Sequence, residues 1–303
     1  MGATSTPMLA RRRFRMALLA GSTVLAACLE EEAPTRGALR AIDDAGRLVA
    51  LERPATRIVS LAPSSTATLV RLGVSGRLLA RTGYDRDPEI AGLPVIATGS
   101  LAPSAERVVE LAPDLVVVWG DPATRPLATR LSVLGLSVYV SEPRTIADVL
   151  WTTRRLGRLV GEEARADSLI EAIRTRLATV KQAVERRSAP GVLFLVWTDP
   201  PFTTGSGTYA DEVIRQAGGR NVFSDLHRQW GEVSLEAILD RDPDWILAAK
   251  LPDTLAGTRW SSLSAVREGR VLTMDPDLLH RPGPGVAEAV ERIARRLHPG
   301  AFP

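Results

Sequence analysis

Two glutamates occupy the same place in two copies of one sequence pattern. The first copy reads SAERVVELAPDL at residues 104–115, and the second reads SLEAILDRDPDW at residues 234–245. In each copy a glutamate, Glu106 or Glu236, stands eight residues before the aspartate of a Pro-Asp pair, and a short apolar run follows that pair. A carboxylate accepts a bidentate pair of hydrogen bonds from an arginine, so these acids are candidates for contacts with a basic partner. The alternative is that both are solvated residues near helix N-termini, where acidic side chains are favourable.

Signals for catalysis and for metal binding are weak. The stretch TGSGT at residues 204–208 lacks the lysine of a phosphate-binding loop, and no G-x-S-x-G is present. His227, His280 and His298 are scattered, and His280 has Asp275 and Asp277 nearby in a spacing that matches no zinc signature. We therefore expect no catalytic residues, no metal and no resident cofactor. An α/β enzyme with a cleft between two lobes stays as the alternative from another functional class.

The N-terminus has the features of an export signal. Residues 1–27 contain RRRFR and then the apolar run MALLAGSTVLAA, which is shorter than the roughly 20 residues of a membrane-spanning helix. The ending LAAC resembles the lipobox of bacterial lipoproteins, whose cysteine is lipidated. Cys28 is the only cysteine, so it has no disulfide partner within the chain. We predict a lipoprotein signal peptide at 1–27, lipidation of Cys28 and a flexible tether at 28–38, with Sec and Tat export both open because RRRF faintly resembles a twin-arginine signal.

The charge distribution argues against a nucleic-acid partner. The leader holds four Arg and no acidic residue, so the formal net charge of +3 falls to −1 without it. Acidic and basic residues are interspersed in the 276 residues that follow, and no basic run remains there. That length suits one large domain or two of ordinary size.

Strands and helices are predicted to alternate on both sides of a helical segment. Residues 39–51 have the pattern of a hairpin, and the runs that follow, beginning with RIVSLAP and SSTATLVRLG, indicate strands and helices in turn. After Gly191 the same order returns, with VLFLVW as a strand, TDPPFTTGSG as a loop and a final helix from Val286 to Leu297. Trp119, Trp197 and Trp245 lie in predicted strands and are expected in the core.

The middle of the chain has helical periodicity. Apolar residues recur at helical spacing through residues 145–187, with Gly161 as the interruption. A helix of about 24 residues would reach about 36 Å, enough to cross a domain. The predicted fold class is therefore α/β, with two pseudo-symmetric lobes at 39–143 and 190–303 joined by a long helix within a connecting segment at 144–189. A ligand cleft is expected between the lobes, at the C-terminal ends of the strands.

In this order of motifs the chain resembles the periplasmic substrate-binding proteins of ABC importers that have a helical backbone, and in particular their vitamin B12-binding branch. The resemblance covers roughly residues 40–299. The motifs that carry it are RIVSLAPSST, LPVIATGSLAPSAERVVELAPDLVVVW, VWTDPPFTTG, AGGRNVFSD, WGEVSLEAILDRDPD and DPDLLHRPGP. It implies a monomeric protein, held at the membrane by its lipid, that captures a corrinoid outside the cytoplasm and delivers it to a permease and ATPase complex.

The resemblance also implies roles for individual residues. Glu106 and Glu236 stand where the family has one glutamate per lobe that docks onto arginines of the permease. The positions that match ligand contacts are aromatic in the first lobe and mixed in the second: Tyr84, Phe202, Trp230, Asp277 and Arg281. Phe202 could instead anchor a loop, and Asp277 with Arg281 could be a surface pair.

Two departures bear on the ligand. The B12 binder has a cleft tryptophan shortly before its first docking glutamate, where this chain reads ATGS, and many relatives have Glu where this chain has Ala67. Haem and ferric siderophores are therefore the alternative ligands within the same family. Haem would need an axial histidine or tyrosine, for which His280 and Tyr84 are candidates, whereas siderophore sites tend to have more Arg and Tyr than this chain offers.

Overall fold

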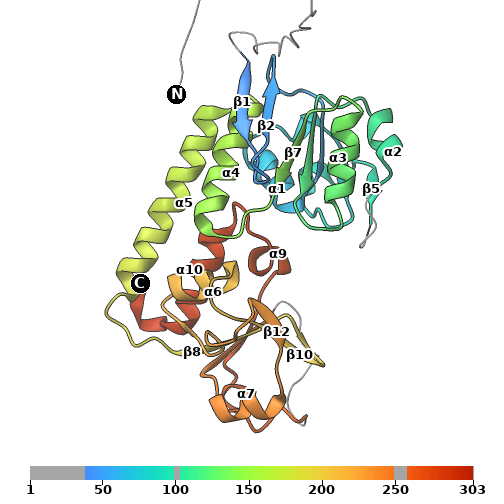
Figure 1. Ribbon diagram of the computed structural model, residues 1–303. Coiled ribbons are helices and arrows are strands. Elements are labelled where there is room, and N and C mark those ends of the chain that lie inside the picture. The colour runs from blue at the N-terminus through green and yellow to red at the C-terminus, as the bar shows by residue number, and fades with distance from the viewer. Residues whose placement is uncertain (1–37, 99–102, 249–257, 303) are drawn as a thin grey trace, which may run out of the picture. The chain divides into compact units, whose positions relative to one another are not determined.

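The computed structural model describes residues 38–98, 103–248 and 258–302, without the side chains of Pro276 and Asp277. These residues belong to one compact unit. Two parallel sheets, each covered by helices, form a first and a second lobe (Figure 1). The predicted fold class, two related α/β lobes with a helical connection, is confirmed. The predicted leader, Cys28 and the tether up to residue 37 lie outside the described residues.

The first lobe has a five-stranded parallel sheet in the order β5-β4-β3-β6-β7. Its elements are β1 (Leu39–Ile42), β2 (Leu48–Leu51), β3 (Ile58–Leu61), α1 (Pro63–Arg71), η1 (Ser75–Arg77), β4 (Leu78–Thr82), η2 (Pro88–Ile90), β5 (Val95–Ala97), α2 (Ala105–Glu110), β6 (Leu115–Trp119), α3 (Arg125–Val133) and β7 (Val138–Ser141). The predicted hairpin at 39–51 is confirmed as the antiparallel pair β1–β2. Its turn covers the edge strand β7, because the Asp43 carboxylate accepts a hydrogen bond from the Val140 N–H at 3.1 Å.

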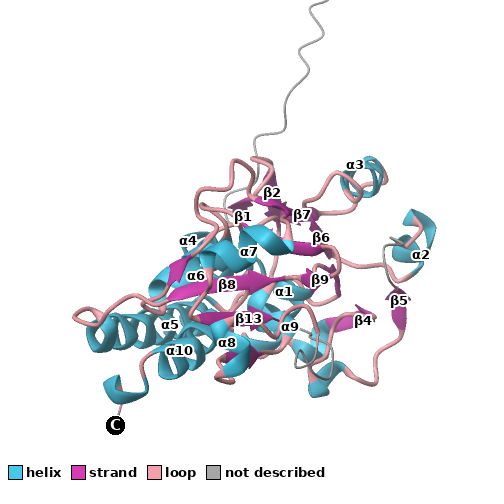
Figure 2. Ribbon diagram, turned by 90° about the horizontal axis from the view of Figure 1, so that it is seen from below, coloured by secondary structure: helices cyan, strands magenta, loops and turns pink. Residues whose placement is uncertain are grey.

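The second lobe repeats the strand order of the first. Its parallel sheet runs β11-β8-β13-β14, which corresponds to β4-β3-β6-β7. Its elements are β8 (Gly191–Leu195), β9 (Trp197–Thr198), β10 (Pro201–Thr204), α6 (Tyr209–Gln216), β11 (Arg220–Asn221), β12 (Trp230–Glu232), α7 (Leu235–Arg241), β13 (Trp245–Ala248), α8 (Ser264–Arg267), β14 (Val271–Thr273), α9 (Pro276–Leu279), α10 (Val286–Leu297) and η3 (Pro299–Ala301). Figure 2 shows β8 and β13 side by side, as their parallel pairing requires.

The repeated Pro-Asp pairs have the same structural role in both lobes. The residue before each proline has a positive φ, 44° at Ala112 and 30° at Asp242, which turns the chain sharply between helix and strand. The next aspartate then binds the backbone at the start of the neighbouring strand. Asp114 accepts hydrogen bonds from the backbone N–H groups of Thr56 and Arg57 at 2.9 and 3.0 Å. Asp244 accepts one from the Gly191 N–H at 2.6 Å.

The connecting segment is two helices rather than one continuous helix. α4 (Ile146–Leu159) and α5 (Glu163–Val184) meet at a turn in which Gly161 has φ 72°, a conformation that glycine adopts without strain. With 22 residues, α5 is about 33 Å long. Its first turn packs Ala166 into a core cluster of the first lobe, and Ile173 and Val180 pack into a cluster of the second. In Figures 1 and 2, α5 lies beside α10, to which Arg176 is linked by an ion pair with Glu291.

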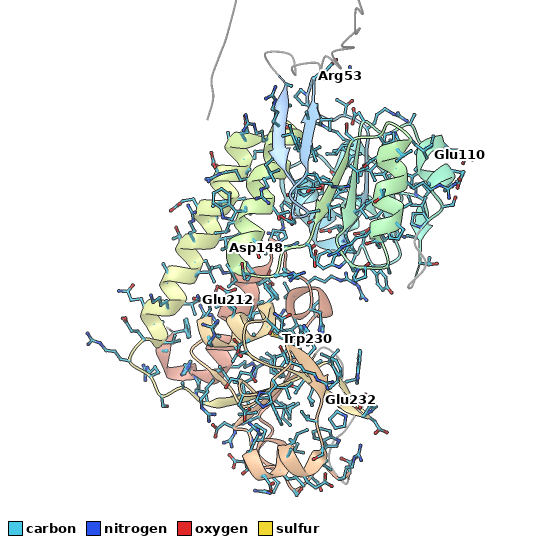
Figure 3. All side chains as sticks on the ribbon, in the orientation of Figure 1. Arg53, Glu110, Asp148, Glu212, Trp230 and Glu232 are labelled. Atoms are coloured by element: carbon cyan, nitrogen blue, oxygen red, sulfur yellow. The ribbon has the colours of Figure 1, made fainter. Side chains whose placement is uncertain are left out.

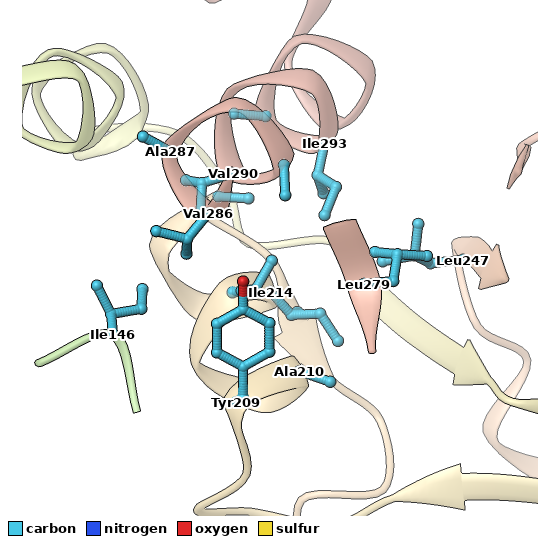
Figure 4. Packing of buried hydrophobic residues seen from close by; sticks show 14 of the residues in the cluster. Ile146, Tyr209, Ala210, Ile214, Leu247, Leu279, Val286, Ala287, Val290 and Ile293 are labelled. Atoms are coloured by element: carbon cyan, nitrogen blue, oxygen red, sulfur yellow. The ribbon is translucent and has the colours of Figure 1, made fainter. Parts of the chain in front are cut away.

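The start of α4 is anchored in the second lobe. Figure 4 shows Ile146 in the same apolar cluster as Tyr209, Ile214 and Val286. The Glu212 carboxylate on α6 accepts a hydrogen bond from the Ile146 N–H at 2.8 Å, and Figure 3 shows Glu212 close to Asp148 of the α4 capping box. Apolar packing and capping therefore fix where the connecting helices leave the second lobe.

The stretch predicted as the loop TDPPFTTGSG is largely strand. β9 and β10 pair around Asp199 and Pro200, and β12 joins β10 on the other side, so that β12-β10-β9 form a small antiparallel sheet. The prolines and glycines suggested a loop, but Pro201 is the first residue of its strand, where a missing N–H is tolerated. The final helix, predicted from Val286 to Leu297, is confirmed with those bounds.

Candidate ligand-binding site

A pocket of about 420 Å³ lies where strand ends of the first lobe meet a segment of the second. Leu61, Thr82 and Trp119, the last residues of β3, β4 and β6, line it, which is where parallel α/β sheets bind ligands. His280 and Arg281 form its second-lobe wall. The other lining residues are mostly apolar and include Pro63, Ala97, Pro103, Val118 and Leu127.

Tyr84 and Arg281, two of the predicted ligand contacts, meet at this pocket. The Arg281 guanidinium carbon lies 5.1 Å from the centroid of the Tyr84 ring, and the Nη1 of Arg281 donates a hydrogen bond to the Tyr84 backbone carbonyl at 3.1 Å. The Tyr84 side chain is 44% exposed. A cation beside an aromatic face and a charge-assisted hydrogen bond therefore connect the two lobes at the pocket wall.

The loop that carries Tyr84 is held by a buried carboxylate. Asp85 is buried and accepts a hydrogen bond from the Thr82 N–H at 2.6 Å, and the Thr82 hydroxyl accepts one from the Tyr84 N–H at 3.1 Å. Burial raises the pKa of Asp85 above its ordinary value, because the ionised form loses contact with water. These bonds fix the backbone that positions the Tyr84 ring.

His280 presents a largely buried imidazole to the pocket. Its ring centroid lies 5.3 Å from that of Phe194, in an edge-to-face arrangement. Burial, with the neighbouring charge of Arg281, lowers the pKa of His280, so the ring is neutral at pH 7. A neutral imidazole beside a cavity is a hydrogen-bonding group and also the form that ligates a metal.

The other two predicted aromatic contacts, Phe202 and Trp230, do not line this pocket. They lie on β10 and β12 of the small antiparallel sheet. Trp230 is 37% exposed, and its ring stands edge-on to that of Phe194 at 6.2 Å between centroids. Phe194 is fully buried and also contacts His280, so Trp230 packs on the ring behind the second-lobe wall of the pocket.

The prediction that three tryptophans are in the core is wrong for Trp197. That side chain is 52% exposed and stands on β9, beside the Phe202 ring. The parallel strand β8 ends at Leu195, so Trp197 belongs to the next strand, which leaves the core. Trp119 is half-buried and lines the pocket, a role that the sequence reading missed. Trp245 is half-buried and packs against the core of the second lobe.

Asp277 belongs to α9, but its side chain lies outside what the structure describes. Beside the first pocket is a second one of about 330 Å³, which shares Pro63, Ser64, Tyr84 and Arg281 with it. This second pocket is bordered by charged residues of both signs: Arg71, Arg86, Asp87, Asp275, Glu288 and Arg292. The site therefore has an apolar side and a charged side, with Tyr84 and Arg281 between them.

Glu106 and Glu236 occupy equivalent positions at the starts of α2 and α7. Each follows a serine N-cap: Ser104 accepts from the Arg107 N–H at 3.3 Å, and Ser234 accepts from the Ala237 N–H at 3.1 Å. Both glutamates are exposed. Their pKa values are lowered, chiefly by hydrogen bonding from their own backbone N–H groups, as expected for acids in the first turn of a helix.

The two glutamates differ in their neighbours. Glu106 forms an ion pair with Arg130 of α3, which further lowers its pKa. Among the described residues, Glu236 has no ion-pair partner. An arginine of a partner protein would therefore compete with Arg130 at Glu106 and would meet an unpaired carboxylate at Glu236.

Two further findings concern metals and membranes. Within the described ranges, no three His, Cys, Asp or Glu side chains are grouped closely enough to hold a metal ion. None of the helices in the described part of the chain is long and apolar enough to cross a membrane.

Comparison with known proteins agrees with this geometry. The family model described as "Periplasmic binding protein" matches residues 58–278. The chain is 29% identical over 274 residues to the uncharacterized ABC transporter substrate-binding lipoprotein YvrC of Bacillus subtilis (strain 168), covering 86% of each. It is 28% identical over 246 residues to the vitamin B12-binding protein of Photorhabdus laumondii subsp. laumondii, covering 80% of this chain and 88% of that protein.

Solved structures with the same fold have different ligands. The periplasmic vitamin B12-binding protein BtuF of Vibrio cholerae has a TM-score of 0.70 and 27% identity, covering 80% of this chain and 97% of that one. A periplasmic haem-binding protein of Pseudomonas aeruginosa has a TM-score of 0.70 and 25% identity, covering 82% and 95%. An ABC-type Fe3+-hydroxamate transport system protein of Saccharomonospora viridis has a TM-score of 0.69 and 25% identity, covering 86% and 98%. These proteins share the fold of this chain, but the ligands in their names differ.

Proposed function

The chain belongs to the periplasmic binding protein family, and from this premise we propose that it captures a corrinoid, cobalamin, and delivers it to the permease of an ABC importer. The observation that carries the proposal is the apolar pocket at the strand ends, where Tyr84 of one lobe meets Arg281 of the other. A corrin ring is a broad apolar plate fringed with amides. Aromatic walls suit the plate, and a guanidinium suits the amide oxygens.

The ligand site extends from the pocket into the second lobe. Tyr84, Phe202, Trp230, Asp277 and Arg281 are its proposed contacts, and binding involves no catalysis and no resident cofactor. The lobes hold the ligand between them, and α5, which packs against both, limits their relative motion. A protein that only binds and releases its ligand gives no turnover of any substrate, and this separates it from an α/β enzyme.

Haem is the second candidate ligand, and His280 is the observation that favours it. This imidazole lines the pocket and is neutral at pH 7, as an axial ligand of haem iron would be. A phenol-rich siderophore site has less support, because Tyr139 and Tyr209 are buried and Tyr84 is the remaining tyrosine.

Delivery requires docking onto the importer, for which Glu106 and Glu236 are the proposed contacts. One exposed carboxylate per lobe lets two arginines of the permease bind both lobes at once, so the cleft faces the translocation path. We further propose that residues 1–27 are removed and that Cys28 carries a lipid, so that a monomer is held at a membrane, outside the cytoplasm. YvrC, a relative named as a lipoprotein, supports this anchor.

The test is a titration of the purified protein with cyanocobalamin, haem and ferrichrome, followed by quenching of tryptophan fluorescence. We expect saturable quenching at micromolar or lower cyanocobalamin, with weaker binding of the other two. If haem alone gave saturable quenching, with a Soret shift that His280→Ala removes, the ligand would be haem and not a corrinoid. Binding of none of the three would contradict the proposed ligand classes, and steady turnover of a substrate would revive the enzyme alternative.

A further inference from the structure

Trp197 and Phe202 form an aromatic pair on the second lobe, in which Phe202 is half-buried and Trp197 is exposed. Their ring centroids lie 5.0 Å apart with 33° between the planes. The two residues are Cα partners in the antiparallel pairing of β9 with β10, so their side chains project from the same face of the small sheet. Because Trp197 is 52% exposed, a large flat apolar surface is left in contact with water.

The same face carries two more side chains. Glu232 of β12 is the Cα partner of Phe202, and Trp230 is two residues from Glu232 on the same strand. Period-two alternation therefore places Trp197, Phe202, Trp230 and Glu232 on one face, which we call the aromatic shelf. Figure 3 labels Trp230 and Glu232 on this strand. Glu232 is exposed, and among the described residues it has no ion-pair partner.

The opposite face of the sheet serves the fold. Pro201 and Thr203 of β10 are buried, and the Thr203 hydroxyl donates a hydrogen bond to the Phe194 carbonyl at 2.6 Å. The sheet is thus fixed on β8 through one face, and Trp197 and Phe202 on the other face belong to no core cluster of the described residues. An aromatic pair left outside the core and in contact with water is typical of a binding surface.

The aromatic shelf adjoins the second-lobe wall of the pocket, with the buried Phe194 ring between them. The Trp230 ring contacts Phe194 edge-on, and Phe194 contacts His280, which lines the pocket beside Arg281. A ligand larger than this pocket of about 420 Å³ would extend beyond it toward the shelf. This proximity, with Phe202 and Trp230 proposed above as ligand contacts, assigns the shelf's occupant to the same ligand rather than to a separate partner.

We propose that Trp197 is a ligand-contacting residue, and that the aromatic shelf recognises a flat conjugated macrocycle whose edge carries amides rather than carboxylates. The proposal rests on the proposed function. Trp197 and Phe202 supply stacking for the flat ring. The Glu232 carboxylate accepts hydrogen bonds from amide N–H groups at the ring edge, and it repels the carboxylates of haem. The shelf therefore favours a corrinoid over haem and over a non-planar siderophore.

Trp151 offers a matched control for Trp197. It is 54% exposed on α4, with Arg154 5.9 Å from its ring, has no aromatic neighbour among the described residues, and does not line the pocket of the candidate site. Trp197→Leu and Trp151→Leu thus remove tryptophans of similar exposure from different surfaces. Trp197→Phe keeps a flat ring and should recover part of any lost affinity. Melting curves of each variant check that the fold is retained.

The experiment is a fluorescence titration of these variants with cyanocobalamin and ferrichrome. Trp197→Leu should weaken cyanocobalamin binding about tenfold, while ferrichrome binding changes by less than about twofold. Trp151→Leu should leave both unchanged. If folded Trp197→Leu bound cyanocobalamin with wild-type affinity, the proposed role of the aromatic shelf would be wrong, and the proposed function would be unaffected. Absence of cyanocobalamin binding by the wild type would instead overturn the corrinoid function and the shelf with it.

Glu232→Gln tests the charge selection separately. The amide keeps the size of the side chain and removes its charge, so haem binding should strengthen about threefold to tenfold while cyanocobalamin binding falls or stays level. Unchanged haem affinity would contradict the assigned role of Glu232. Glu171→Gln on α5, an exposed acid outside the pocket lining, serves as the control.

Discussion

Arg281 and Tyr84, 197 residues apart in the chain, make two different contacts with each other across the candidate site. The guanidinium lies 5.1 Å from the centre of the aromatic ring, and it also donates a hydrogen bond to the tyrosine's backbone carbonyl at 3.1 Å. Tyr84→Leu removes the ring and keeps the carbonyl, whereas Arg281→Gln removes the cation. A double-mutant cycle can therefore measure the ring–cation contact alone.

We expect a coupling of about 0.5–1 kcal/mol in the free energy of unfolding, measured with urea, because both groups are partly exposed. Each single variant should also bind cyanocobalamin more weakly than the wild type, since both side chains line the pocket. Additive effects on unfolding, within error, would show that the aromatic contact contributes nothing to stability.

The Pro-Asp aspartates should matter for stability rather than for binding. Asp114→Ala leaves the Thr56 and Arg57 N–H groups without their acceptor, and we expect the free energy of unfolding to fall by about 1–3 kcal/mol. Asp240→Ala, which removes an exposed acid of α7, should change it by less than about 0.5 kcal/mol. Urea unfolding measures both. Loss of ligand affinity in folded Asp114→Ala, without loss of stability, would contradict this structural role.

Gly157 should be essential where the two connecting helices cross. A Cβ at this buried position of α4 would lie 2.4 Å from the Cβ of Ala166 on α5. Gly157→Val should therefore force the helices apart and lower the free energy of unfolding by about 1–3 kcal/mol. Gly76→Ala, where a Cβ would meet nothing within 4 Å, is the control. Wild-type stability of Gly157→Val in thermal unfolding would show that the crossing is loosely packed.

Acid should destabilise the protein through His280. Its pKa is lowered by burial and by Arg281, so as the pH falls below about 6.5 the unfolded chain takes up a proton before the folded one does. The free energy of unfolding should therefore decrease with falling pH in that window, by no more than about 1.4 kcal/mol per pH unit for this group. His280→Gln should reduce the slope of the free energy of unfolding against pH. Because burial also lowers the pKa of His298, His298→Gln reports the contribution of that residue. If His280→Gln left this pH dependence unchanged, His280 would not be the source of the acid destabilisation.

The docking residues can be tested by charge reversal. Glu106→Arg with Glu236→Arg should abolish association with membrane vesicles that carry the cognate importer, while cyanocobalamin affinity stays within about twofold. Glu171→Arg on α5 should leave both unchanged. Arg130→Gln should strengthen association, because it removes the ion pair that competes for Glu106. Lost ligand affinity in the double reversal would mean that these acids do not dock.

The repeated elements could be predicted because each is encoded locally. Serine caps, apolar helical spacing and Pro-Asp turns identify α2, β6, α7 and β13, and Gly161 identifies the break between the connecting helices. The small antiparallel sheet could not be predicted in this way. Its pairing of Phe202 with Glu232 is non-local, and the run VLFLVW does not reveal that the parallel strand ends before Trp197.

The candidate site could be predicted only in part, because it too depends on contacts between segments that are distant in the chain. Tyr84 and Arg281 line one pocket, but their contact depends on how two distant segments meet. Trp119 looked like a core residue because its strand is a continuous apolar run, although it is the last residue of that strand and reaches the pocket. Trp119 lies where ligands of parallel sheets bind, at the C-terminal end of a strand.

The most direct test of the corrinoid site is a crystal structure of the protein with cyanocobalamin bound. We expect the corrin ring between the lobes, with Tyr84 and Arg281 on one side and Trp197, Phe202 and Trp230 on the other, and Glu232 within hydrogen-bonding distance of a ring-edge amide. A ligand bound away from the pocket, or one that leaves both Tyr84 and the aromatic shelf without contact, would contradict the proposed site.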